Sequence, residues 1–188
     1  SRNDCVCTHD RILMPNPYPA RFVELLHETD GLTLDCGSGG RAYPGVVSLE
    51  YTRSAEIDIQ GDGLNLPFRD GSFTLVLSQA VLEHVTDPQA YVDEIHRVLK
   101  PGGLAYFEAA FIQPIHMPPM HYFNITPHGL AHLCRGFEVV ETGTIGWFAE
   151  TIAWLCRESG VPVPSVSEPP DHLRHCAASG VSLLGRKP

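Results

Sequence analysis

The stretch "FTLVLSQAVLEHVTDPQAYVDEIHRVLKPGGLAYFEAA", residues 73–110, changes its hydrophobic pattern twice. Residues 73–79 form a nearly continuous apolar run, which is typical of a strand buried on both faces of a parallel sheet. Residues 87–100 place apolar side chains at helical spacing, with Asp87 as the cap and Pro88 in the first helical position. "PGG" then ends the helix, and residues 104–110 form the next strand. The stretch therefore predicts a strand–helix–strand unit.

The same alternation extends on both sides of this unit. A short amphipathic helix within residues 18–29 precedes strands at 32–35, 46–50 and 55–62. Further along, we expect helices at 126–136 and 149–158 and strands at 137–145 and 180–186. The pattern indicates an α/β fold: a Rossmann-like, doubly wound, mostly parallel seven-stranded sheet with shortened helices after strands 1 and 2.

The length and composition fit a single domain over residues 1–188, because 188 residues with 43% hydrophobic content can bury a sizeable core. Within it we expect residues 1–18 to be irregular. Residues 111–126 hold three prolines among bulky aromatic residues and predict a loop that covers a site. Residues 159–171 are rich in proline and serine and predict an exposed loop.

The charge of the chain excludes some partners. A net charge of −9 with 13 lysines and arginines lacks the basic surface expected of a nucleic-acid-binding protein. No apolar stretch is long enough to span a bilayer, and no basic-then-apolar leader is evident. We therefore expect a cytoplasmic protein that binds neither nucleic acid nor membrane.

The cysteines do not predict a disulfide framework or a metal site. Of the six, four lie singly in apolar segments, where a buried thiol is the simpler explanation. "CVC", Cys5 and Cys7, is followed by His9, but no second CxxC or HxxxH completes a tetrahedral zinc site. The sequence therefore predicts no bound metal.

The link "LTLDCGSGGRAYPGVVSLE", residues 32–50, indicates the type of cofactor. Dinucleotide-binding folds place a helix after the glycines, and its N-terminus faces the pyrophosphate. Here Asp35 and Glu50 are too close in sequence for such a helix, and "RAYPG" contains proline. This disfavours NAD and favours a cofactor without phosphate, such as S-adenosylmethionine. Asp35 suits the cationic side of that molecule, and Glu50 can accept hydrogen bonds from the ribose hydroxyls.

Residues 61–109, "GDGLNLPFRDGSFTLVLSQAVLEHVTDPQAYVDEIHRVLKPGGLAYFEA", resemble the core of class I S-adenosylmethionine-dependent methyltransferases. The resemblance is to the small-molecule methyltransferases marked by "LPF", "LEH" and "RVLKPGG". It implies metal-independent, in-line transfer of a methyl group to an oxygen or nitrogen of a small-molecule acceptor, with S-adenosylhomocysteine as the product.

The resemblance also implies positions for the cofactor. Asp35, Gly37, Ser38 and Gly39 match the glycine motif at the methionine part. Glu50 matches the acid that binds ribose, Tyr51 a side chain that packs on adenine, and Asp62 the acid at the adenine amino group. The remaining positions are backbone neighbours of the adenine and residues lining the methyl region: Gly63, Leu64, Ser78 and Gln79. The usual third glycine is displaced, since Arg41 stands in its place.

The catalytic candidates are histidines: His84 behind the fourth strand, and His116 and His121 in the 111–126 loop. An imidazole there could act as a base toward an oxygen acceptor. A structural role is the alternative for each. Reading His116 and His121 as metal ligands is disfavoured because no carboxylate is near them in the sequence.

Two other functions remain open at this stage. One is a non-catalytic cofactor-binding module, or a degenerate methyltransferase domain of a larger protein. The other is a nicotinamide-dependent oxidoreductase, which the missing helix argues against. The sequence names neither the methyl acceptor nor the oligomeric state.

Overall fold

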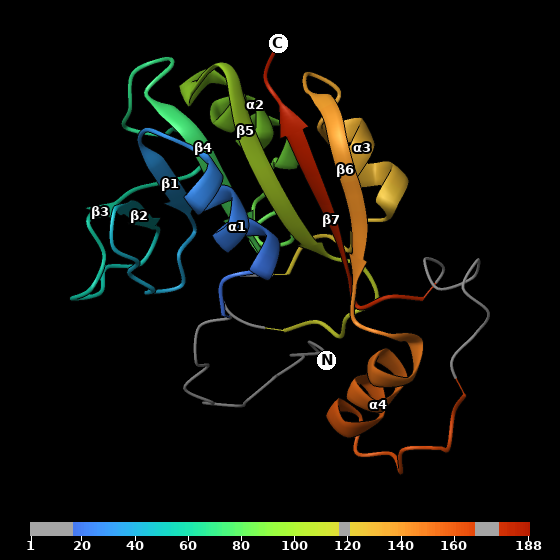
Figure 1. The fold of residues 1–188 in the computed structure, drawn as a ribbon. Coiled ribbons are helices and arrows are strands. Elements are labelled where there is room, and N and C mark those ends of the chain that lie inside the picture. The colour runs from blue at the N-terminus through green and yellow to red at the C-terminus, as the bar shows by residue number, and fades with distance from the viewer. Residues whose placement is uncertain (1–16, 117–120, 168–176) are drawn as a thin grey trace.

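A computed structural model describes residues 17–116, 121–167 and 177–188, which form an open sheet with helices on both faces (Figure 1). The helices are α1 (Ala20–Glu28), α2 (Pro88–Val98), α3 (Pro127–Leu133) and α4 (Phe148–Glu158). The strands are β1 (Thr33–Cys36), β2 (Val46–Glu50), β3 (Ile59–Gln60), β4 (Phe73–Gln79), β5 (Leu99–Ala110), β6 (Glu138–Ile145) and β7 (Gly180–Arg186).

The seven strands form one sheet in the order β3-β2-β1-β4-β5-β7-β6. Neighbours from β3 to β5 are parallel, and β7 runs antiparallel to both β5 and β6. This confirms the expected α/β class with a mostly parallel seven-stranded sheet. The strand order reverses at β1 and β4, so ligands are expected beyond the carboxyl ends of these two strands.

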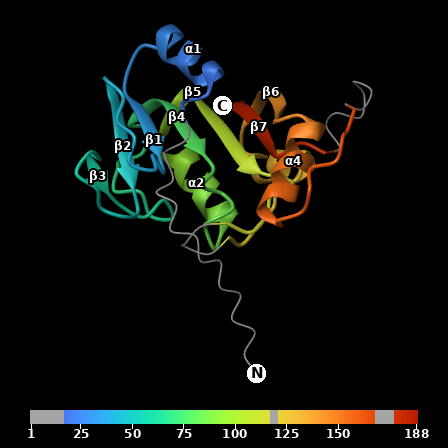
Figure 2. The same ribbon diagram turned by 90° about the horizontal axis from the view of Figure 1, so that it is seen from below.

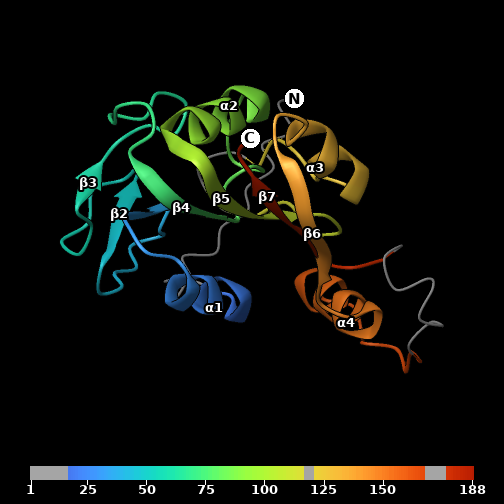
Figure 3. The ribbon, with the colours of Figure 1, turned by 45° about the horizontal axis from the view of Figure 1, so that its top comes forward.

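The two faces of the sheet are covered unequally. Figure 3 shows α2 and α3 on one face and α1 on the other, whereas α4 lies beyond the end of β6 (Figures 1 and 2). The larger core cluster packs under α2 and α3, and a smaller one packs α1 on β4, β5 and β7. The links 37–45 and 51–58 are fully described and contain no helix, so the predicted loss of helices after the first two strands is confirmed.

Local capping chemistry follows the sequence closely. Asp87 accepts a hydrogen bond from the Ala90 N–H at 3.0 Å, and Thr126 accepts one from the Gly129 N–H at 3.0 Å. A side-chain oxygen at the cap satisfies one of the free N–H groups of the first helical turn. The cap expected for the helix at 87–100 is therefore confirmed, and Thr126 caps α3, which ends at Leu133, in the same way.

Two element boundaries differ from the prediction. The helix α2 ends at Val98, and "PGG" belongs to β5, because the Gly102 N–H donates to the Lys187 carbonyl at 2.8 Å and extends the pairing. The strand β3 is only two residues long. Just before β3, the Asp58 carboxylate accepts a hydrogen bond from the Ser48 N–H of β2 at 2.9 Å. This side chain takes the place of a backbone hydrogen bond between β2 and a longer β3.

Other expectations concern loops and membrane insertion. Residues 161–167 have no regular structure and are mostly exposed. Residues 168–171 and the first sixteen residues, including Cys5 and Cys7, lie outside the described residues, so the exposed loop over 159–171 and the irregular start stay predictions. Within the described ranges no helix combines the length and apolar character needed to cross a membrane.

Candidate functional site

Three carboxylates lie at the carboxyl edge of three neighbouring parallel strands. Asp35 is near the end of β1, Glu50 ends β2, and Asp62 follows β3 by two residues. The register aligns Asp35 with Ser48 and Glu50 with Gln60. Because parallel strands end at the same edge, the fold brings together acids that are far apart in the chain.

The glycine link between β1 and β2 comes close to the next turn of the chain. Gly37 has a φ of +86° and Gly39 a φ of +59°, conformations that residues with a side chain rarely adopt. A Cβ on Gly37 would lie 2.3 Å from the Cγ2 atom of Val81. The Gly37 and Ser38 N–H groups both donate to the Leu49 carbonyl, at 2.9 and 3.1 Å, and the Gly39 N–H donates to the Glu50 carboxylate.

Glu50 ties the two sides of this link together. Its carboxylate accepts hydrogen bonds from the Gly39 N–H at 2.7 Å and from the Tyr51 N–H at 2.8 Å. The Tyr51 side chain is 64% exposed, so its ring face is open to a planar ligand. These contacts hold the Glu50 carboxylate at the edge of the sheet, where it can accept further hydrogen bonds.

Asp35 belongs to a set of side chains that surrounds a positive charge. Its side chain is fully buried and accepts a hydrogen bond from the Tyr18 hydroxyl at 2.7 Å. The Arg41 guanidinium lies 3.3 Å from the Asp35 carboxylate, 4.5 Å from the centre of the Tyr18 ring, and donates to Gln79. We call Asp35, Gln79 and Tyr18 the cation cage.

Burial raises the pKa of Asp35, and the Arg41 charge and the Tyr18 hydrogen bond oppose that rise. The same burial, together with the Asp35 charge, raises the pKa of the Tyr18 hydroxyl. Tyr18 therefore stays protonated and donates a hydrogen bond to the Asp35 carboxylate. The cage offers a carboxylate, an amide oxygen and an aromatic face, which are the groups that bind organic cations.

Two predicted cofactor residues, Ser38 and Ser78, are fully buried. The Ser78 hydroxyl forms a hydrogen bond of 3.0 Å with the Tyr91 hydroxyl, which also contacts the Cys36 carbonyl. The Ser38 carbonyl accepts from the Arg41 side chain at 2.9 Å, and the Ser38 hydroxyl has no hydrogen-bond partner within the described parts of the chain. The Ser78 hydroxyl is therefore engaged within the core.

The predicted adenine-side positions form an exposed turn. The Asp62 carboxylate is exposed and accepts from the Leu64 N–H at 2.9 Å. A Cβ on Gly63 would lie 2.4 Å from the Tyr91 ring, so this position requires glycine for packing alone. The turn follows β3, next to the Glu50 end of β2.

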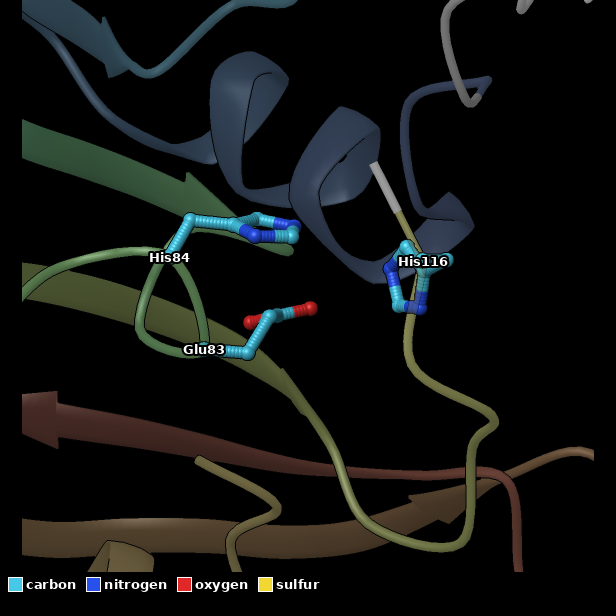
Figure 4. Close-up of side chains that lie close together, drawn as sticks. All are labelled: Glu83, His84 and His116. Atoms are coloured by element: carbon cyan, nitrogen blue, oxygen red, sulfur yellow. The ribbon is translucent and has the colours of Figure 1, made fainter. Parts of the chain in front are cut away.

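The three candidate histidines come together, with a carboxylate that the sequence analysis did not single out. The ring centres of His84 and His116 are 5.3 Å apart, those of His84 and His121 5.7 Å, and those of His116 and His121 4.7 Å. Figure 4 shows the Glu83 carboxylate between His84 and His116. We call Glu83, His84, His116 and His121 the histidine cluster.

Backbone hydrogen bonds assemble this cluster from two distant segments. The chain after β5 turns back, so that the Tyr122 N–H donates to the Glu83 carbonyl at 2.7 Å and the Ile125 N–H donates to the Ala110 carbonyl at 2.7 Å. On the other side, Val81 contacts Gly37, as described above. The histidine cluster therefore lies beside the glycine link.

Glu83 is an unusual carboxylate. Its side chain is fully buried, and neither oxygen has a hydrogen-bond partner within the described parts of the chain. Burial raises the pKa of Glu83 to about 7, although the nearby backbone N–H groups of Glu83 and Ala110 act in the opposite direction. Burial also lowers the pKa of His116. Perturbed groups in one cluster at the ligand-binding edge mark a candidate site.

Sequence reasoning missed Tyr18, Arg41 and Glu83. Arg41 carried a signal, since it stands where the family's third glycine is expected. Glu83 adjoins His84 in "LEH", but nothing in the sequence shows that its carboxylate meets His116. Tyr18 lies before α1, and only the packing of that helix brings its hydroxyl to Asp35.

Known proteins resemble this chain in both sequence and fold. A family model described as a methyltransferase domain matches residues 34–107. A protein of Encephalitozoon cuniculi named as a methyltransferase is 36% identical over 98 residues, which is 44% of this chain and 47% of that protein. The chain thus matches about half the length of that relative.

Solved structures share the fold at low sequence identity. A Burkholderia thailandensis 1,6-didemethyltoxoflavin-N1-methyltransferase, with its substrate and S-adenosylhomocysteine bound, has a TM-score of 0.59 at 15% identity, covering 89% of this chain and 75% of that one. The cyclase SpnF also has a TM-score of 0.59, at 17% identity, covering 89% and 80%. These structures are similar in fold, and one of them is named for a reaction other than methyl transfer.

Proposed function

We propose that this chain is a class I S-adenosylmethionine-dependent methyltransferase and that it transfers a methyl group from S-adenosylmethionine to an oxygen or nitrogen of a small-molecule acceptor by in-line displacement. The proposal rests on the residues at the carboxyl edge of β1, β2 and β4.

The cation cage carries the proposal. It surrounds a guanidinium, which shows that Asp35, Gln79 and the Tyr18 ring together suit a positive charge at this edge. S-adenosylmethionine has two cationic groups at its methionine end, the sulfonium and the ammonium. The cage fits that end once the Arg41 side chain moves aside, and the freed guanidinium can then pair with the cofactor's carboxylate.

The Glu50 end fits the nucleoside part. Glu50 is held by the Gly39 and Tyr51 N–H groups, and its oxygens can accept hydrogen bonds from a ribose diol. The link 37–45 contains no helix, so the edge lacks the helix N-terminus that a pyrophosphate needs. This favours S-adenosylmethionine over NAD.

When bound, S-adenosylmethionine supplies a methyl group already activated by the sulfonium, so the displacement itself requires no metal. The chain's part is to position the acceptor and to exclude water. We place the acceptor beside the histidine cluster, where His84, His116 and His121 are the polar groups nearest the glycine link. An imidazole there could take the proton of a hydroxyl acceptor, and this catalytic role stays a prediction.

Calorimetry tests the cofactor assignment. We expect S-adenosylhomocysteine to bind the chain and NAD to show no binding under the same conditions. Glu50→Ala should weaken S-adenosylhomocysteine binding by at least about tenfold, because it removes a charged hydrogen-bond acceptor. Asp30→Ala is the matched control. Asp30 is an exposed carboxylate before the amino end of β1, at the edge of the sheet opposite to the carboxyl ends of the strands, and its loss should leave binding unchanged.

Turnover tests the reaction. The chain is incubated with S-adenosylmethionine and a panel of small hydroxyl and amine acceptors, and methylated products are detected by mass spectrometry. Product formation that is lost with Glu50→Ala supports the proposal. Tight S-adenosylhomocysteine binding without any product across the panel would favour a non-catalytic module, and equal affinity of Glu50→Ala and the wild type would show that the cofactor lies elsewhere.

A further inference from the structure

The histidine cluster contains the ligand set of a metal site. One nitrogen or oxygen atom each from Glu83, His84 and His116 can be chosen so that all three lie within 4.8 Å of one another. In the sequence no carboxylate lies near His116 and His121, which disfavours a metal there. In the folded chain, however, the segment after β5 returns and brings His116 to Glu83 (Figure 4).

The Glu83 carboxylate is the first sign of a missing partner. A fully buried carboxyl group with no hydrogen-bond partner in the described chain costs stability, and such groups in native proteins call for an unseen ion, water or ligand. His84 and His116 flank this carboxylate (Figure 4). A bound cation would compensate the charge of the Glu83 carboxylate. That carboxylate and the two imidazoles would together supply three ligands to the cation.

The orientation of His116 is the second sign. Its Nδ1 atom lies 2.8 Å from the Pro114 carbonyl, which can only accept, so Nδ1 carries the proton and Nε2 keeps its lone pair. Metal-bound histidines commonly have this arrangement: one nitrogen donates to a backbone carbonyl, and the other ligates. The backbone therefore already presents His116 in the tautomer that a metal requires.

His121 and Asn124 extend the same pattern. The Nε2 atom of His121 lies 3.0 Å from the Asn124 Oδ1 atom, and its Nδ1 atom lies 3.2 Å from Nδ1 of His116. With the proton on Nε2, His121 turns a lone pair toward His116. His121 is therefore in place to support the orientation of the His116 ring.

We propose that Glu83, His84 and His116 bind a divalent transition-metal ion of the zinc class, with an open coordination position at the acceptor side. Two imidazoles and one carboxylate are a common ligand set for zinc with an open position. Tetrahedral zinc holds such ligand atoms about 3.4 Å apart. The distances between the ligand atoms, which are within 4.8 Å, would therefore shorten by up to about 1.4 Å on binding, a change that side-chain rotation can supply. The site does not depend on the proposed methyl transfer, because the metal alone tests it.

The test is a zinc titration of the chelator-treated chain, followed by calorimetry and by thermal unfolding. The titration is run in a background with Cys5→Ser, Cys7→Ser, His9→Ala, His175→Ala and Cys176→Ser, because two short stretches of the sequence, Cys5–His9 and His175–Cys176, hold thiols and imidazoles that could bind zinc independently. We expect one equivalent of zinc to bind and to raise the unfolding temperature. Glu83→Gln and His116→Ala should each weaken zinc binding by at least about tenfold. His128→Ala, an exposed histidine on α3, is the matched control and should bind as before.

Cobalt is the second probe and needs no variant of the cluster. Co²⁺ bound by nitrogen and oxygen ligands should show visible d–d bands without thiolate charge transfer, and zinc should displace it. No zinc binding by the parent chain, unchanged binding by Glu83→Gln, or a thiolate band with cobalt would each overturn the proposal. If Glu83→Gln and His116→Ala fail to fold, the cobalt spectrum still decides. Failure of the metal site leaves the S-adenosylhomocysteine titration unaffected, so the two proposals are distinguishable.

Discussion

The cation cage and the histidine cluster both adjoin the glycine link, but the buried carboxylates of the two groups have different partners. In the cage, the buried Asp35 carboxylate contacts an arginine and a tyrosine of the same chain. In the cluster, the equally buried Glu83 carboxylate has no hydrogen-bond partner in the described chain. Arg41 supplies a positive charge to the cation cage, so the cage can fold without a cationic ligand. The buried Glu83 carboxylate has no such partner, which indicates that the histidine cluster binds a cation.

Gly37 joins the two regions, and its substitution should have the largest effect. In Gly37→Ala the new Cβ would lie 2.3 Å from Val81 in the turn that also carries Glu83, and φ is +86°. We expect a loss of about 3 kcal/mol in unfolding free energy, from backbone strain and overpacking together. Denaturant unfolding measures it, and both S-adenosylhomocysteine and zinc binding should weaken.

Gly45→Ala is the matched control for that change. Gly45 lies in the same link with a φ of +81°, but a Cβ there meets nothing within 4 Å. Only the backbone strain remains, so the loss should be about 1 kcal/mol. Equal losses for the two alanine variants would show that Val81 yields freely and that Gly37 does not couple the two regions.

Tyr18→Phe separates the regions by acting on the cage alone. It removes the 2.7 Å hydrogen bond from the Tyr18 hydroxyl to Asp35 but keeps the aromatic ring. Because the acceptor is a partly compensated buried carboxylate, unfolding free energy should fall by about 1.5 kcal/mol. S-adenosylhomocysteine affinity should fall as well, and the zinc affinity of the histidine cluster should not change. A change in zinc affinity would contradict the separation of the two regions.

The pH dependence of stability should show the smallest effect, with a sign that distinguishes two carboxylates. Burial raises the pKa of Asp35 in the folded chain. The contribution of Asp35 to the free energy of unfolding is therefore fully present at pH values below its pKa in the unfolded chain, and it is lost as the pH rises through its pKa in the folded chain. The hydrogen bond from Arg97 lowers the pKa of Glu94 in the folded chain. The contribution of Glu94 to the free energy of unfolding is therefore present at pH values above its pKa in the unfolded chain, and it is lost as the pH falls through its pKa in the folded chain.

Denaturant unfolding between about pH 3 and pH 7 tests these signs, since carboxylates titrate in that range. Relative to the wild type, Asp35→Asn should remove a decline of stability with rising pH. Glu94→Gln should remove a decline with falling pH. Matching changes of slope in the two variants would mean that Arg41, not burial, sets the charge of Asp35.

Much of the fold was predictable because local rules determine it. The continuous apolar run of β4, the Asp87 and Thr126 caps and the left-handed glycines each depend on a few neighbouring residues. The short β3 was not predictable, because a hydrogen bond from Ser48 to the distant Asp58 replaces part of its pairing.

The candidate site divides in the same way. The acids Asp35 and Glu50 were predictable, since strand ends in a parallel sheet share one edge. The inward direction of the Ser78 hydroxyl was not, because it depends on a hydrogen bond from Tyr91 across the core. That these residues bind the cofactor stays a prediction until the titrations above are done.

The sequence by itself determined the order of elements, the class of fold and the absence of a helix in the glycine link, because these depend on periodicity, capping and spacing. Only the tertiary structure decided which charges meet. Arg41 enters the cation cage and Glu83 meets His116 through contacts between residues 6 and 33 positions apart. Such meetings depend on how the chain after each strand folds back, which no local pattern of residues specifies.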